Sequence, residues 1–238
     1  MGSTRLPGKV LEEVCGKALL KYQIERVQRA TLLDEVVVAT SVLAQDDIIA
    51  EFCDKHNIAC FRGSEDDVLA RYYECAKQYG ADIIVRLTAD CPLLDPNIID
   101  EVVRLFKAEN ADYASNTTPL ETSTFPDGSD VEVFSMAAME RAHKECKDAH
   151  DREHVTFYFW KYDNGFRTAQ LIQQENWSKY RFTVDYPEDL EVVSFILKEF
   201  NSRHIFGHIA DIIEMLNSNK EIAQKNAKYY AGIGWEKK

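Results

Sequence analysis

The sequence alternates short β-branched runs with amphipathic helical stretches, and this alternation is the strongest limit on its fold. Residues 35–40 form a nearly continuous apolar run, typical of a parallel strand covered on both faces. The rhythm continues with a helix over 46–56, a strand over 58–61, a helix over 65–79, a strand over 82–87 and a helix over 96–107. This order predicts an α/β fold, a doubly wound and mostly parallel sheet.

The regular alternation of strands and helices ends after residue 111. Residues 117–130 form a polar segment that is too long for a routine connection, which favours a binding loop. Further strands are expected over 113–116, 131–134 and 181–184, further helices over 136–147 and 152–162, and helices from residue 187 to the end. We predict a single domain over residues 1–238, with residues 117–180 as an elaboration.

Charge and hydropathy exclude several classes of protein. Lys and Arg total 28 against 40 Asp and Glu, a net charge of −12, so the chain repels polyanions and a nucleic-acid scaffold is not expected. Every apolar run is far shorter than the about 20 residues of a membrane-spanning helix, so we predict no membrane partner and a cytoplasmic location. The six cysteines show no C-x-x-C spacing and are interpreted as reduced packing residues.

The segment Gly2–Lys9 combines glycines, hydroxyls and cations just before a helical stretch. Glycines let backbone N–H groups approach a polyphosphate, and Arg5 and Lys9 add positive charge. The spacing of a Walker loop is absent. On these residues alone, a phosphate site and a simple basic turn are both open.

Two aspartates follow predicted strands. Asp90 lies in Thr88–Leu93, and Asp185 ends the run Phe182–Asp185. Ligands of open α/β sheets bind at the carboxyl ends of strands, and two carboxylates there could share one Mg²⁺. For Asp185 alone, a helix N-cap is the competing interpretation.

Seven motifs in the same order carry a family resemblance. They are STRLPGK (3–9), DEVVVAT (34–40), FRGSEDDVLARYY (61–73), TADCPLLDP (88–96), FPDGSDVEVF (125–134), REHVT (152–156) and FTVDYPEDLE (182–191). Together they resemble the cytidylyltransferases of the SpsF, spore coat polysaccharide biosynthesis, type, which are relatives of CMP-KDO and CMP-sialic acid synthetases. The resemblance runs from Gly2 to about Phe200.

The resemblance implies a Mg²⁺-dependent transfer of CMP from CTP to a sugar, releasing pyrophosphate, in the biosynthesis of a surface polysaccharide or glycan. The implied catalytic residues are Arg5, Lys9, Asp90 and Asp185, and the last two also hold the metal. Nucleotide contacts are expected from Gly2, Ser3, Arg5, Lys9, Asp67 and Arg71. For Asp66 and Asp67, favourable charge in a first helical turn is an equal alternative.

The later motifs imply the acceptor side. Asp127, Asp130, Glu132, Arg152 and His154 are expected to face the sugar, within a 117–180 region that binds the acceptor or forms a homodimer. A 2-keto sugar acid is the preferred acceptor, because relatives use the anomeric hydroxyl of such acids and Arg152 could grip a carboxylate with two parallel hydrogen bonds. A surface ion pair with Glu153 is the alternative for Arg152. The aromatic run 157–160 could be a dimer contact or core packing.

Two departures from the family pattern matter. Ala89 stands where relatives have glycine, which costs backbone freedom but need not disturb a metal site. Relatives also carry a hydrophobic strand and an arginine before the Met-Gly-Ser run, whereas this sequence begins at Met1. We therefore expect a sheet that lacks its usual first strand, with exposed edges on both neighbours, and a shortened chain that is inactive or completed by another strand.

Other functions stay open. His150 and His154 match H-x-x-E-H, an inverted zinc-protease signature, although five residues match often by chance. A sugar 1-phosphate nucleotidyltransferase, a nucleotide-sugar glycosyltransferase and a non-catalytic nucleotide-binding remnant are further alternatives. Pyrophosphate release from CTP separates them, because a glycosyltransferase would release none.

Overall fold

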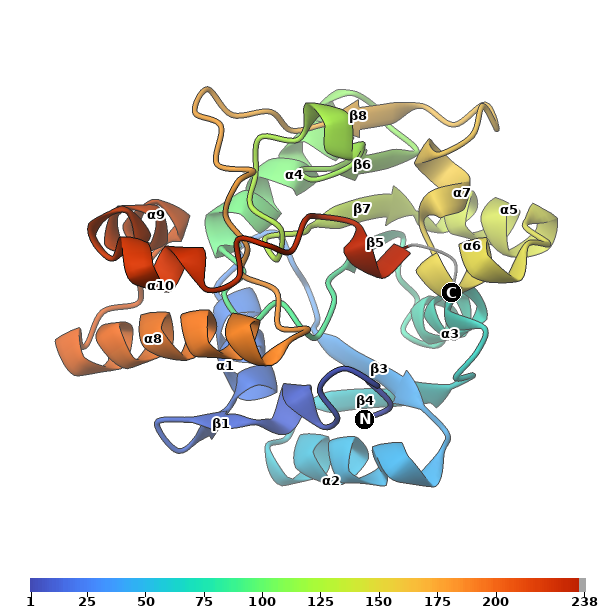
Figure 1. Cartoon of the computed structure of the whole chain (residues 1–238). Coiled ribbons are helices and arrows are strands. Elements are labelled where there is room, and N and C mark those ends of the chain that lie inside the picture. The colour runs from blue at the N-terminus through green and yellow to red at the C-terminus, as the bar shows by residue number, and fades with distance from the viewer. Residues whose placement is uncertain (236–238) are drawn as a thin grey trace.

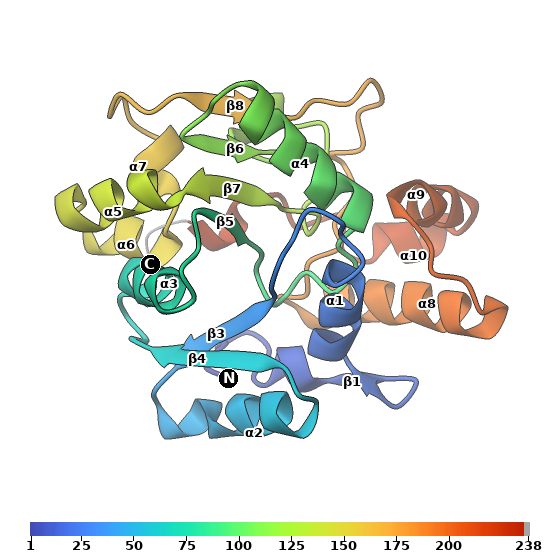
Figure 2. The same cartoon turned by 180° about the vertical axis from the view of Figure 1, so that it is seen from behind.

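The sheet of the computed structural model is divided into two parts (Figure 1 and Figure 2). The structure describes residues 1–235. Strands β3 (Val37–Ser41) and β4 (Ala59–Gly63) pair in parallel and form the first part. The second part has the order β5 (Ile83–Arg86), β7 (Glu132–Ser135), β6 (Tyr113–Ser115) and β8 (Thr168–Gln170). Strand β7 is antiparallel to both of its neighbours, so this part is mixed rather than mostly parallel.

An apolar slot separates the two parts. Among the strands of residues 1–235, β3 pairs only with β4 and β5 only with β7. A cavity of about 510 Å³ lies between the facing edges and is lined by residues 36–39 and 83–87. The expected gap in the sheet, with an unpaired edge on each neighbouring strand, is present within residues 1–235.

Helices cover both sides of the sheet. In chain order they are α1 (Leu19–Val27), α2 (Asp47–Lys55), α3 (Val68–Gln78), α4 (Pro96–Ala108), α5 (Met136–Glu145), α6 (Ala149–His154), α7 (Phe157–Trp160), α8 (Pro187–Arg203), α9 (Ile209–Ser218) and α10 (Lys220–Gln224). Short 3₁₀ turns occur at η1 (Lys9–Leu11), η2 (Ala44–Asp46), η3 (Leu120–Thr122) and η4 (Ile233–Trp235), and β1 (Glu13–Val14) pairs with β2 (Lys17–Ala18). None of the helices within residues 1–235 is both long and apolar enough to cross a membrane.

The core is concentrated around the four-stranded part. Helix α4 begins at Pro96 after the N-cap Asp95, whose carboxylate accepts the Asn97 N–H at 3.0 Å, and it packs against β6, β7 and β8. Its apolar face joins Val133 and α8 in the largest core cluster. All six cysteines are free thiols. Five of them are buried or half-buried, as packing residues are, whereas Cys15 is exposed and is not a packing residue.

Three sequence-based expectations for secondary structure were wrong. Residues 181–184 form no strand: they contribute an isolated bridge between Arg181 and Asp127, because their amides are divided between the Asp127 and Asp90 carbonyls. The helix expected over 152–162 is two helices, since Val155 takes a φ of 63° and ends the first. Strand β8 (Thr168–Gln170) was missed, because it is only three residues long, has polar residues at both ends and pairs only with β6 at the edge of the sheet.

Candidate functional site

The segment Gly2–Lys9 forms a compact loop that points two cations toward the strand ends. Gly8 has a φ of 74°, a left-handed conformation that glycine adopts without strain, and it begins η1 at Lys9. The Met1 ammonium contacts Asp46 Oδ1 at 2.6 Å, which ties the loop to the carboxyl end of β3. Ser3 Oγ accepts the Leu6 N–H at 3.3 Å, so this hydroxyl stabilises the turn.

Lys9 joins the two strand-end aspartates. Its ammonium donates hydrogen bonds of 2.8 Å to Asp90 Oδ2 and of 2.8 Å to Asp185 Oδ1, so these oxygens lie no farther apart than twice that distance. The Val184 N–H donates to the Asp90 carbonyl at 2.8 Å and holds the two segments side by side. Asp185 is therefore not the N-cap of α8, which is Tyr186.

The positive charges of this cluster keep Asp185 ionised. Burial raises the pKa of Asp185, but the charges of Lys9 and Arg5 outweigh burial and bring this pKa down to about 2. Arg5 donates to Asp185 Oδ1 at 2.8 Å. Carboxylate oxygens are the ligands that Mg²⁺ takes, and the Lys9 ammonium lies between them as a cation would. The pair Asp90 and Asp185 thus fits a divalent cation.

Arg181 is a central residue that the sequence interpretation missed. It donates to Asp185 at 3.0 Å, to Asp189 at 2.9 Å and at short range to Asp127. Asp189 in turn accepts the N–H groups of Asp185 and Tyr186, each at 3.0 Å. The sequence feature that could have identified Arg181 is its position directly before the run Phe182–Asp185, which ends at the predicted metal ligand. This network fixes the orientation of the candidate metal ligand.

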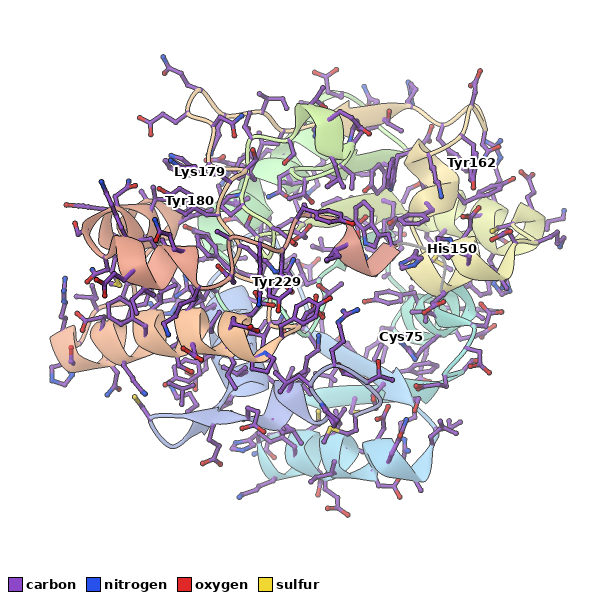
Figure 3. All side chains as sticks on the ribbon, in the orientation of Figure 1. Cys75, His150, Tyr162, Lys179, Tyr180 and Tyr229 are labelled. Carbon is purple, nitrogen blue, oxygen red and sulfur yellow. The ribbon has the colours of Figure 1, made fainter. Side chains whose placement is uncertain are left out.

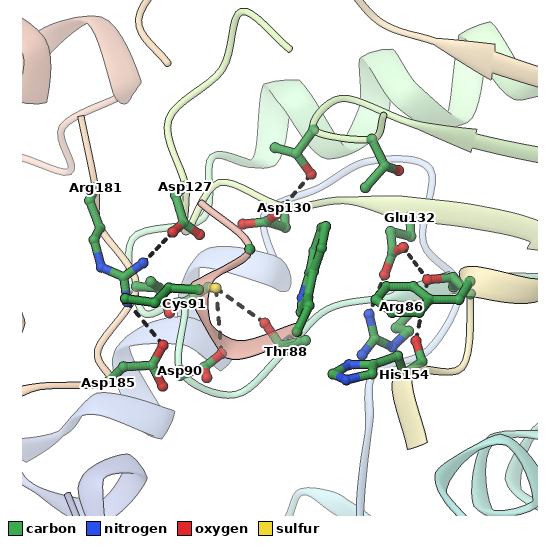
Figure 4. Close-up of a pocket in the computed structure, with 18 of the residues that line it drawn as sticks. Arg86, Thr88, Asp90, Cys91, Asp127, Asp130, Glu132, His154, Arg181 and Asp185 are labelled. Atoms are coloured by element: carbon green, nitrogen blue, oxygen red, sulfur yellow. Dashed lines mark hydrogen bonds and ion pairs between the residues drawn. The ribbon is translucent and has the colours of Figure 1, made fainter. Parts of the chain in front are cut away.

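A polar cavity of about 230 Å³ lies beside this cluster (Figure 4). Its charged lining consists of Arg5, Arg86, Asp90, Asp127, Asp130, Glu132, Arg181 and Asp185. Burial and the neighbouring charge of Asp130 raise the pKa of Asp127 to about 8 although Arg181 lies against it. The structure thus brings the predicted metal residues and the predicted acceptor residues Asp127, Asp130 and Glu132 to one cavity.

The far side of the cavity is built on Glu132 in β7. Glu132 pairs at short range with Arg86 and accepts hydrogen bonds from Tyr113 at 2.7 Å and Thr156 at 2.5 Å. His154 also lines the cavity, and burial together with the charges of His150 and Arg86 lowers its pKa to about 4. His154 is therefore uncharged at neutral pH.

Other predicted site residues lie elsewhere. Arg152, expected at the sugar, is not part of the cavity lining: it donates to Asp67 at 2.8 Å and to the His143 and Cys146 carbonyls. Asp67 is the N-cap of α3 and accepts the Ala70 N–H at 2.9 Å. This contact agrees with the alternative in which Asp67 stabilises the start of a helix. Arg71 donates to the Ser64 carbonyl at 2.8 Å and lines the slot.

The first residues of the chain lie outside the cavity lining, and the aromatic helix α7 packs into the core. Gly2 lies beside Gln45 and Glu65, and neither Gly2, Ser3 nor Lys9 belongs to the cavity lining itself. In α7, Phe157 and Phe159 are buried inside the chain, as core packing requires.

The histidines of the zinc alternative do not converge with Glu153. Among residues 1–235, the side chains close enough to share a metal are Asp148, His150 and Asp151. His150, which is labelled in Figure 3, also makes a 3.0 Å hydrogen bond between its Nε2 and the Trp235 carbonyl. Glu153 is exposed. The arrangement gives no support to a zinc-protease site at this helix.

Comparisons with known proteins agree with this geometry. A family model described as cytidylyltransferase matches residues 1–235. The chain is 35% identical to an uncharacterised protein of Methanocaldococcus jannaschii over 95% of this chain and 90% of that protein. It is 31% identical to the spore coat polysaccharide biosynthesis protein SpsF of Bacillus subtilis, over 94% of this chain and 93% of SpsF.

Solved structures give the same result. A cytidylyltransferase from Leptospira borgpetersenii aligns with a TM-score of 0.87 and 34% identity, covering 94% of this chain and 93% of that one. A CMP-2-keto-3-deoxy-manno-octonic acid synthetase complexed with CTP shares the fold, with a TM-score of 0.61 and 16% identity over 83% of this chain and 95% of that chain. By sequence and by structure, this chain belongs to the cytidylyltransferase family of nucleotidyltransferases.

Proposed function

We propose that the protein transfers CMP from CTP to a sugar hydroxyl, with Mg²⁺ held by Asp90 and Asp185, in the biosynthesis of a surface polysaccharide or glycan. One observation carries the proposal: these two carboxylates meet Lys9 and Arg5 beside a polar cavity. The resemblance to SpsF and the match to a cytidylyltransferase family support it.

The chain's own residues have separate roles in this reaction. A bond forms between the sugar hydroxyl oxygen and the α-phosphorus of CTP, and the hydroxyl proton passes to the Asp130 carboxylate in the cavity. The bond from that phosphorus to the bridging oxygen breaks, and pyrophosphate leaves with both electrons of that bond. Arg5 and Lys9 stabilise the charge that grows on this leaving group. Bound Mg²⁺ would supply positive charge against the phosphate oxygens.

The acceptor is held by the other half of the cavity. Asp127 and Asp130 accept hydrogen bonds from sugar hydroxyls and position one of them for attack. Phosphoryl chemistry of this kind needs positioning and charge neutralisation more than a protein nucleophile.

The test is pyrophosphate release with each of CTP, ATP, GTP and UTP, with and without Mg²⁺, across a panel of sugars. We expect release with CTP and Mg²⁺, and a loss of at least about 100-fold in Asp90→Asn and Asp185→Asn. Asp54→Asn, an exposed position on α2, is the matched control and should keep full activity. Equal turnover in all three variants would overturn the proposal.

A further inference from the structure

The C-terminal segment, residues 226–235, runs along the cavity. It passes from α10 to α6 and α7 (Figure 1). Three of its residues, Gly232, Ile233 and Trp235, belong to the cavity lining. The last family motif ends at residue 191, so the motifs assign no role to this segment.

The first half of the segment is fixed to the start of α8. Asn226 is buried and donates to the Arg181 carbonyl at 3.1 Å and to Asp189 Oδ1 at 2.9 Å. The Tyr229 ring stacks on the Tyr186 ring, with the centroids 3.9 Å apart and the planes within 5°. These contacts hold the segment beside the candidate metal ligands.

The other end of the segment is fixed to the aromatic helix. The Trp235 ring centroid lies 5.2 Å from that of Phe157 and 5.9 Å from that of Trp160. The Trp235 carbonyl makes a 3.0 Å hydrogen bond with His150 Nε2. Because both ends are held, the segment forms a wall of the cavity.

Three buried donors of the cavity lining have no hydrogen-bond partner within residues 1–235: Arg5 Nε, Arg86 Nε and Trp160 Nε1. A buried N–H group without a partner is costly, so such groups mark places where a ligand oxygen is expected. Arg5 lies at the metal ligands, since it pairs with Asp185. Trp160 packs on Trp235, so one expected oxygen lies beside the C-terminal segment.

This end of the cavity is the acceptor side. Figure 4 shows Arg86 and His154 across the cavity from Asp185. The Phe157 ring stacks on His154 with the centroids 4.5 Å apart, and Trp235 packs on Phe157. Aromatic faces next to a hydrogen-bond donor suit the apolar C–H face and polar rim of a sugar ring.

We propose that the C-terminal segment completes the acceptor site, with Trp235 as a residue that determines sugar binding. The sugar packs a C–H face on the Trp235 indole, and one of its oxygens accepts a hydrogen bond from Trp160 Nε1. Tyr229 is a positioning residue, because it holds the segment on Tyr186 and lies outside the cavity lining. This inference rests on the proposed function and extends it to a segment outside the family motifs.

The experiment measures sugar binding without turnover. The probes are 3-deoxy-manno-octulosonate, N-acetylneuraminate, glucose and galactose. Calorimetry is done with Mg²⁺ and a CTP analogue that has a methylene group between its α- and β-phosphorus atoms, because that bond cannot be cleaved. For every sugar that binds, we expect Trp235→Ala to weaken the affinity at least about tenfold and to leave the affinity for the CTP analogue unchanged.

Trp177→Ala is the matched control, since Trp177 donates to Glu175 outside the cavity and should leave sugar binding unchanged. Equal sugar affinity in Trp235→Ala and the unchanged protein would overturn the inference, and so would binding of none of the four sugars. Sugar binding that Trp235→Ala weakens, but with no pyrophosphate release from CTP and Mg²⁺, would instead contradict the proposed function and leave the inference standing.

Two further variants separate contact from positioning. Trp160→Phe keeps the ring and removes the N–H donor, so we expect sugar binding to weaken about fivefold. Tyr229→Leu removes the stacking on Tyr186 and should weaken it about threefold, whereas Tyr229→Phe keeps the stacking and should retain the full affinity. Unchanged affinity in Trp160→Phe would contradict the assigned hydrogen bond, and equal affinities in the two Tyr229 variants would contradict the positioning role.

Discussion

The two parts of the divided sheet differ in how deeply they are buried. In the four-stranded part, every residue of β6 is buried, and so are three of the four residues of β7, whereas the edge strands β5 and β8 are mostly half-buried. In the two-stranded part, all of β4 and the first three residues of β3 are only half-buried. The two-stranded part has no central strand, because β3 faces the slot without a ladder partner among residues 1–235 and β4 pairs only with β3.

This difference corresponds to a division of the site. The packed part positions the acids and the sugar cavity through β5, β7 and the segment before α8. The loosely packed part anchors the loop that brings Arg5 and Lys9, through the contact of Met1 with Asp46. The acidic residues of the site therefore lie on the more deeply buried part of the sheet, and the loop that carries Arg5 and Lys9 contacts the less buried part.

Core substitutions should show the difference most strongly. Phe134, fully buried in β7 with its ring centroid 5.2 Å from that of Phe159, should lose about 3–5 kcal/mol of unfolding free energy on change to Ala. Val38→Ala in β3, where the side chain is half-buried, should lose about 1 kcal/mol. Denaturant unfolding measures both, and similar losses would mean that the two parts are equally well packed.

The cationic loop should matter for turnover more than for stability. We expect Lys9→Met to lower kcat about 100-fold to 1,000-fold, equal to about 2.7–4 kcal/mol, because it removes charge that faces the leaving group. Lys17→Met, which removes a surface pair with Glu25, is the control and should leave kcat unchanged. A tenfold loss or less in Lys9→Met would place Lys9 outside the catalytic machinery.

Arg152 should behave as a structural residue of the packed part. Arg152→Met should cost about 2 kcal/mol of unfolding free energy, since it breaks charge-assisted hydrogen bonds between α3 and α6, and should leave the KM for the sugar unchanged. Arg203→Met, an exposed pair with Glu199, should cost about 0.5 kcal/mol or less. A raised KM with unchanged stability would return Arg152 to the acceptor site.

The last difference should come from pH. Because the pKa of Asp127 is raised, this carboxyl keeps its proton in the folded protein at pH values where it is ionised in the unfolded chain. His154, whose pKa is lowered, has the opposite effect below about pH 6.5, so the free energy of unfolding should fall between about pH 6.5 and pH 8. Asp127→Asn should flatten this slope while Asp54→Asn keeps it; an identical slope in both variants would assign the titration to another group.

Much of the fold followed from local pattern. The helices that begin near Asp47, Val68 and Pro96 and the strands near Val37, Ile83 and Tyr113 were expected within a few residues, because apolar periodicity survives whatever the tertiary contacts are. The antiparallel insertion of β7 was not expected, since its alternation fits either strand direction.

Part of the site also followed from the sequence. The motifs pointed to Arg5, Lys9, Asp90 and Asp185, and the structure brings these four together. Arg152 lies outside the cavity lining although its motif reaches the cavity at His154 and Thr156, because its side chain points toward Asp67. Side-chain direction on a short helix is set by its neighbours and not by the motif.

The sequence by itself determined the alternating α/β plan, the family, and the acids that follow the strands, because these depend on residue type and spacing along the chain. Only the tertiary structure decided that Arg181 joins three carboxylates, that the sheet is split by a slot, and that Arg5, Arg86 and Trp160 each have a buried donor without a partner among residues 1–235. Most of these features depend on residues far apart in the chain, such as Arg181 and Asp127. They depend on packing geometry, which no local pattern encodes.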